Sequence, residues 1–82
     1  MYTETSLLEL LKQEDSFIDD VNSWNCNIKR NEEKLKSSKT DKDRSHYNDL
    51  IKHDSQCRDN AANILQSIRD QIRTYLKEVI QV

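Results

Sequence analysis

The stretch KSSKTDKD, residues 36–43, holds no apolar residue and separates two long segments with regular apolar spacing. The whole chain of 82 residues has no glycine and no proline, which are the residues that most often form tight turns and end helices. Long helices are therefore expected on both sides of this stretch. Thr40 is followed three positions later by Asp43, which resembles a capping box with Asp in place of the preferred Glu. The stretch is thus the predicted boundary between two helices.

The segment before this boundary carries two apolar rows with a period of seven residues. They occupy heptad positions a and d, the pattern of helices that pack as a coiled coil. One row is Leu7, Glu14, Val21, Ile28 and Leu35, and the other is Leu10, Phe17, Trp24, Asn31 and Ser38. Leu8, Leu11 and Ile18 widen the apolar stripe near the N-terminus. This pattern predicts a helix over about residues 4–37.

The segment after the boundary carries a second pair of heptad rows. One is Ile51, Arg58, Leu65, Ile72 and Val79, and the other is Tyr47, Asp54, Ala61, Ile68, Tyr75 and Val82. Further apolar residues broaden this stripe, namely Leu50, Ile64, Leu76 and Ile80. The pattern predicts a helix over about residues 42–80, after a polar turn at about residues 38–41.

The heptad frames of the two segments differ by two residues. A continuous coiled coil absorbs insertions of three or four residues, so this shift favours a change of direction. The sequence therefore predicts a single all-α domain, a long antiparallel helical hairpin that packs like a coiled coil. One continuous rod, or three helices with an extra break near Ser16, remain as alternatives.

The segment from Ile28 through the polar turn to Ile68 resembles the antiparallel helices of syntaxin-like N-terminal regulatory regions. The resemblance consists of the apolar periodicity and the polar turn, and it covers about half of the chain. It contains no specific motif, and no function is carried over from it.

Composition and charge argue against several classes of partner. Apolar and charged residues each make up 34% of the chain, and the net charge is −2. Residues 1–24 carry one lysine and six acidic residues (−5), whereas residues 25–44 carry seven basic and four acidic residues (+3). Because acidic residues interrupt the basic stretch, which also lacks stacking aromatics, nucleic acid is not an expected partner. No apolar run approaches the roughly 18 residues that a membrane span requires.

The N-terminal segment is acidic and amphipathic, which is not the pattern of a secretory signal. Two cysteines do not make a disulfide framework. The expected location is therefore intracellular, most simply the cytoplasm, with both thiols reduced.

No residue pattern indicates catalysis, a cofactor or a metal centre. His46, His53 and Cys57 form the most metal-like group, since His53 and Cys57 are four residues apart and share a helical face. A polar helix surface with a half-buried thiol is the preferred explanation, because a tetrahedral site would need ligands from elsewhere. Cys26 lies level with Cys57 in a hairpin but faces outward, so a disulfide is not expected. We predict a non-enzymatic protein without cofactor or metal.

Trp24 lies in the d row, at the level of Asp54 and Arg58 in the expected hairpin. Arg58 is expected over the indole ring, and Asp54 as acceptor of its N–H. Trp24 is also a candidate hot spot for a partner, because tryptophan and arginine dominate protein interfaces.

A hairpin that turns near residue 40 sets residues 7–18 opposite about residues 62–75, where the apolar stripe is wider than two helices need. We expect other helices to cover it, from a second copy in a four-helix bundle or from a different subunit. The expected partner-binding residues are Leu7, Leu8, Leu11, Phe17, Ile18, Trp24, Ile64, Ile68, Ile72, Tyr75, Leu76 and Val79. The predicted function is a helical protein–protein interaction module, either a small subunit or an oligomerising scaffold. The alternative is a regulatory binder, an inhibitor or a trafficking-type adaptor that docks in a partner's helix groove.

Overall fold

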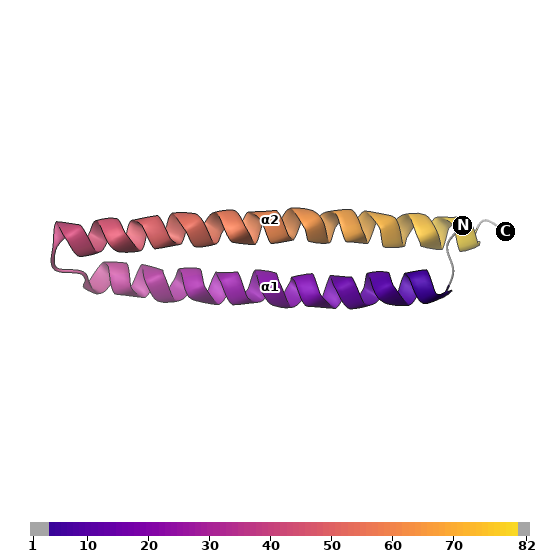
Figure 1. Cartoon of the computed structure of the whole chain (residues 1–82), viewed down its shortest axis with the longest axis horizontal. Coiled ribbons are helices and arrows are strands. Elements are labelled where there is room, and N and C mark those ends of the chain that lie inside the picture. Colours follow the sequence, from indigo (N-terminus) through magenta and orange to yellow (C-terminus); the bar gives the residue numbers. More distant parts are fainter. Residues whose placement is uncertain (1–3, 81–82) are drawn as a thin grey trace.

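The protein is an antiparallel pair of long helices, α1 (Glu4–Ser37) and α2 (Asp41–Ile80), shown in Figure 1. The structure is a computed structural model that describes residues 4–80, and Val82 of the expected d row lies outside the described residues. The predicted all-α hairpin is confirmed. Helix α1 continues without interruption through Ser16, and the chain reverses direction after Ser37, so neither a three-helix arrangement nor a continuous rod is present.

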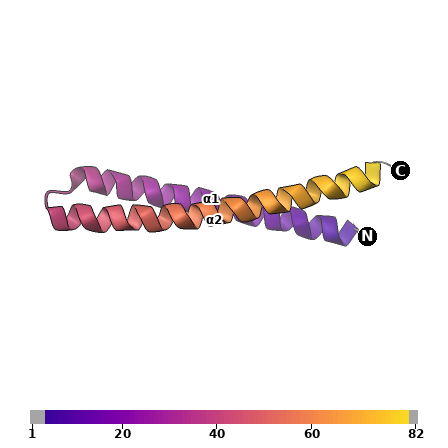
Figure 2. The same ribbon diagram turned by 90° about the horizontal axis from the view of Figure 1, so that it is seen from above.

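The hairpin is long and thin. Its longer helix, α2, contains 40 residues and is therefore about 60 Å long at 1.5 Å per residue. The helices lie side by side in Figure 1 and cross each other near their middles in Figure 2. We call the end where residues 6–18 of α1 lie beside residues 64–79 of α2 the open end; the connection at residues 38–40 forms the turn end.

The turn is closed by side chains instead of by glycine. The Thr40 hydroxyl accepts a hydrogen bond of 3.1 Å from the backbone N–H of Asp43, which caps the start of α2 as the sequence predicts. At the end of α1, the Ser38 hydroxyl donates to the carbonyl oxygen of Lys34 at 2.9 Å. Acidic residues in the first turn of α2 and basic residues in the last turn of α1 suit the two helix dipoles. Among the described residues no backbone φ angle is positive, so glycine is not needed.

The core is a single seam between the two helices. Every buried apolar residue occupies a predicted a or d position, and these residues are Leu10, Ile28, Ala61, Leu65, Ile68 and Tyr75. The least exposed of them, Ile68, still shows 4% of its surface. Two helices alone therefore bury the seam but provide no thick interior.

Polar residues in the seam rows form contacts between the helices. Glu14 Oε2 accepts a hydrogen bond of 3.2 Å from Arg69 Nε, and Asn25 Oδ1 accepts one of 3.4 Å from Arg58 Nη1. The two contacts lie eleven residues apart on both helices, so the pairing advances residue for residue between them. By the same alignment, Val79 lies level with the first residue of α1.

Candidate protein interface

The exposed large apolar side chains of the described chain all lie at the open end. They are Leu8, Leu11, Ile64, Leu76 and Val79, each between 40% and 57% exposed. The corresponding side chains near the turn are at least half-buried, such as Leu35 and Leu50. Surplus apolar surface is therefore a property of one end of the hairpin.

Heptad positions show on which side of the hairpin these residues lie. With Leu7 and Ile51 at position a, Leu11 and Ile18 of α1 and Leu76 of α2 occupy position e. In an antiparallel helix pair the two e positions flank the seam on one side, and the two g positions flank it on the other. Leu11, Ile18 and Leu76 thus border the seam on the same side.

The opposite side confirms this geometry. Ser6 and Gln13 of α1 and Gln71 of α2 occupy position g, and these three residues line one shallow hollow across both helices. Ile64 also occupies position g and lies on this side. The other four exposed large apolar residues lie on the side opposite Ile64. Leu11 and Leu76 occupy position e itself. Leu8 at position b and Val79 at position a both neighbour position e on the helix surface.

We name this side of the open end the lateral apolar face and define it as Leu8, Leu11, Ile18, Leu76 and Val79. Four of its members are exposed and Ile18 is half-buried. All five are among the residues predicted to bind a partner. The face combines residues from both helices, so it forms only when the hairpin forms.

The other residues predicted to bind a partner lie in or beside the seam. Ile68 and Tyr75 are buried between the two helices of the hairpin itself. Leu7, Phe17, Trp24 and Ile72 are half-buried in the same rows. These residues pack the two helices together and so hold the lateral apolar face in position, while Ile64 is exposed on the opposite side.

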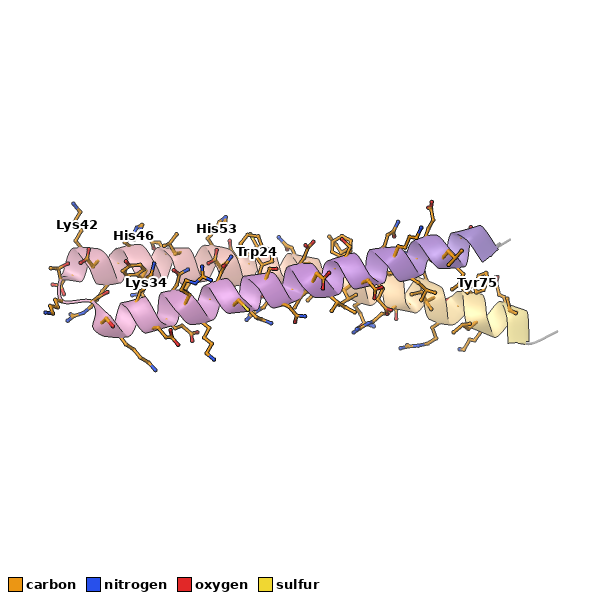
Figure 3. All side chains as sticks on the ribbon, turned by 90° about the horizontal axis from the view of Figure 1, so that it is seen from below. Trp24, Lys34, Lys42, His46, His53 and Tyr75 are labelled. Atoms are coloured by element: carbon orange, nitrogen blue, oxygen red, sulfur yellow. The ribbon has the colours of Figure 1, made fainter. Side chains whose placement is uncertain are left out.

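The surroundings of Trp24 differ from the sequence expectation. Its ring meets the His53 ring edge to face, with centroids 6.3 Å apart and planes at 75°, and Figure 3 shows both residues on the same side of the hairpin. Arg58 instead contacts Asn25 and the neighbouring Asp59. The expected Arg58–indole contact is therefore wrong. Trp24 at position d and His53 at position c lie toward the g side of the seam, whereas Arg58 at position a lies toward the e side.

Asp54 is the buried charged residue of the described chain, with 7% exposure. Its Oδ2 accepts a hydrogen bond of 2.9 Å from Asn31 Nδ2, and its Oδ1 lies 3.4 Å from His53 Nδ1. The expected hydrogen bond from the Trp24 N–H is thus replaced by one from Asn31. The sequence identified both seam positions as polar but did not pair them.

The metal and disulfide alternatives gain no geometric support in the described residues. His53 Nε2 lies 3.8 Å from Cys57 Sγ, but no third ligand joins them, since no group of three metal-binding side chains is present in residues 4–80. His46 instead stacks edge to face with Tyr47. Cys26 and Cys57 are both free thiols.

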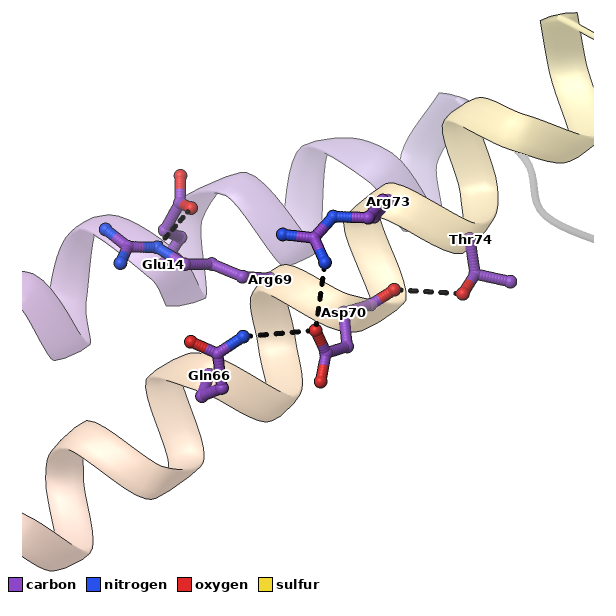
Figure 4. A network of polar contacts seen from close by, with 6 residues as sticks. All are labelled: Glu14, Gln66, Arg69, Asp70, Arg73 and Thr74. Carbon is purple, nitrogen blue, oxygen red and sulfur yellow. Dashed lines mark hydrogen bonds and ion pairs between the residues drawn. The ribbon is translucent and has the colours of Figure 1, made fainter.

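Charged residues border the lateral apolar face with opposite signs on the two helices. On α1, Asp15 at position b follows Leu8 and Leu11 and is exposed. On α2, Arg69 at position e and Arg73 at position b precede Leu76. Figure 4 shows the bond from Arg69 to Glu14 and the 3.7 Å ion pair from Arg73 to Asp70. Asp70 also accepts a hydrogen bond from Gln66 at 3.1 Å. Hydrogen bonds and ion pairs thus hold the charged side chains along this edge of α2, which we call the charged edge.

Within residues 4–80, neither α1 nor α2 has an apolar stretch long enough to cross a membrane. No family model, curated protein or solved structure matches this chain at a significant level, so its class rests on the fold alone: an antiparallel helical hairpin.

Proposed function

We propose that this chain is a non-catalytic helical protein–protein interaction module that acts as a small subunit or oligomerising scaffold of a larger assembly. The observation that carries the proposal is the confinement of the exposed large apolar side chains to the open end, most of them on the lateral apolar face. Apolar residues gathered over two helices, beside an ordered charged edge, are the usual arrangement of an apolar interface core with a polar rim.

The thin core of the hairpin supports the same proposal. A two-helix seam in which no described side chain is fully buried stabilises a chain of this length only weakly. Apolar surface contributes about 25 cal/mol for each Å² removed from water, so covering Leu8, Leu11, Leu76 and Val79 would add stability that the hairpin alone lacks. A partner at the open end therefore serves both binding and folding.

Site-specific photo-crosslinking tests the proposal. A benzophenone amino acid is placed in the full chain at position 8 or, as a matched control, at position 9, and each variant is irradiated in extract of its native cells. Leu8 and Glu9 are adjacent and both exposed, but Glu9 at position c points to the opposite side of the hairpin. We expect crosslinked protein from position 8 and little from position 9. Equal yields from both positions, or no product from either, would overturn the proposal.

A further inference from the structure

We propose that the lateral apolar face binds a second copy of this chain, with a two-fold axis running along the hairpin so that α1 of each copy lies beside α2 of the other. This inference rests on the function proposed above and names the partner. The two open ends then lie at the same level and form an up-and-down four-helix bundle, in which every neighbouring pair of helices is antiparallel.

Charge on the lateral apolar face identifies the partner. Positions b and e point into such an interface. Between residues 8 and 18 of α1, the charged residue at these positions is Asp15. Between residues 66 and 79 of α2, the charged residues at these positions are Arg69 and Arg73. Position f, at the outer edge, carries one positive and one negative residue on each helix. It therefore does not change the net negative charge of the α1 side or the net positive charge of the α2 side. These f residues are Lys12 and Asp19 on α1 and Asp70 and Lys77 on α2. One surface thus carries both signs, each on its own helix, which makes it complementary to itself.

The same charges select the orientation of the two copies. With the two-fold axis along the hairpin, α1 faces the partner's α2, and Asp15 lies level with Arg69 of the partner subunit. With the axis across the hairpin, α1 faces α1, which sets Asp15 against its own copy and the arginines against theirs. A third arrangement shifts the two copies along the hairpin, so that the acidic N-terminal part of one α1 meets the basic C-terminal part of the other. It would place the charged turn end of one copy against the apolar residues of the other. The axis along the hairpin alone satisfies both the apolar and the charged residues.

Both arginines retain donors for this contact. Arg69 is 46% exposed in its side chain and donates through Nε to Glu14, and Arg73 is 69% exposed and reaches Asp70 only at 3.7 Å. A guanidinium group has five N–H donors, so it can hold a carboxylate of its own chain and another across the interface.

The size of the face sets the strength of the dimer. The overlap of the open ends is about 20 Å long at 1.5 Å per residue and two helices, about 20 Å, wide. A footprint of about 400 Å² per copy is below the roughly 800 Å² per partner of a standard interface. We therefore expect a reversible dimer that dissociates on dilution into the micromolar range.

Sedimentation of the purified full chain, from micromolar to near-millimolar concentration, tests the inference. We expect a monomer–dimer equilibrium that Leu11→Asp weakens more than ten-fold. The matched control is Ile64→Asp, which places the same charge on an exposed apolar position on the opposite side of the open end. It should leave the dissociation constant within about two-fold. A wild-type chain that stays monomeric throughout, or an equal effect of the two substitutions, would overturn the inference.

A second substitution, Asp15→Asn, tests the orientation. If α1 meets α2 of the other copy, Asp15→Asn removes an attraction and weakens the dimer about two- to five-fold at low salt, the range of an exposed ion pair. If α1 meets α1, the same change removes a repulsion and tightens the dimer, which would refute the proposed axis.

The two proposals fail in different ways. A crosslink from position 8 whose mass is twice that of the chain supports both. Crosslinks from position 8 only to other proteins, together with a monomeric purified chain, would reject the second copy and retain the interaction module. The absence of a position-specific crosslink would reject the module itself.

Discussion

The two halves of the hairpin share one heptad pattern but fill it with different residues. Near the turn, the seam contains the Asn31–Asp54 hydrogen bond and the Arg58–Asn25 contact. Near the open end, it contains the buried side chains of Leu65 and Ile68. A polar contact, from Arg69 to Glu14, lies at the edge of this part of the seam. Surplus apolar surface occurs only beside the apolar half of the seam, on the described residues.

A single seam must both align the two helices and stabilise their packing, and different residues do each. A hydrogen-bonded polar pair fixes which residues face each other, because any shift would leave a buried carboxylate without its donor. Apolar residues supply most of the stability but tolerate shifts in register. The turn half therefore specifies the alignment, and the open half supplies most of the apolar burial within the hairpin and exposes further apolar surface.

The largest expected effect comes from removing apolar burial in the open half. Ile68→Ala should lower the free energy of unfolding by about 2–5 kcal/mol, because it deletes a nearly buried side chain and leaves a cavity in the seam. Urea denaturation followed by circular dichroism, at one fixed protein concentration, measures the change.

Ile64→Ala is the matched control for this experiment. Ile64 is 47% exposed and one helical turn away from Ile68, so its truncation should change stability by less than about 1 kcal/mol. Similar losses for Ile64 and Ile68 would show that the assigned seam is wrong.

A smaller effect is expected in the turn half from Asn31→Ala. This substitution leaves Oδ2 of the buried Asp54 without its donor and should reduce the free energy of unfolding by about 1–3 kcal/mol. Replacing both residues with leucine should restore or exceed the original stability, since an apolar pair avoids the desolvation of the carboxylate. Chemical denaturation of the two variants gives both values.

Asn22→Ala provides the comparison for Asn31→Ala, because Asn22 is exposed on the same helix. Its effect should stay within about 0.5 kcal/mol. If Asn31→Ala behaves like Asn22→Ala, the polar pair does not hold the register.

Periodicity was enough to predict the fold class and the seam, for a physical reason. Heptad spacing directly encodes which side of each helix is apolar, and the buried set from Leu10 to Tyr75 follows the predicted rows. The turn was also readable, because Thr40 and Asp43 form a local contact that depends only on three-residue spacing.

Contacts between side chains on different helices were less predictable. The ring of Trp24 meets His53, whereas Arg58, which is level with Trp24, turns to Asn25 on the other side of the seam. Ile68 is buried in the seam, whereas Leu76 is exposed. To assign each apolar residue to the seam or to the lateral apolar face, the two helices first had to be placed side by side. Sequence alone located the apolar end, whereas the structure divided it into seam and lateral face.

The smallest expected effect concerns the turn itself. Thr40→Ala removes the acceptor for the backbone N–H of Asp43 and should reduce the free energy of unfolding by about 1 kcal/mol, the usual contribution of a helix N-cap. Ser37→Ala is the control, because the Ser37 hydroxyl only returns a hydrogen bond of 3.2 Å to the Glu33 carbonyl and alanine favours the helix more than serine. Thermal unfolding should therefore separate two hydroxyl deletions that lie three residues apart. Equal losses from both would mean that the end of α1 contributes as much to the reversal as the start of α2, and that Thr40 does not define the point at which the chain turns.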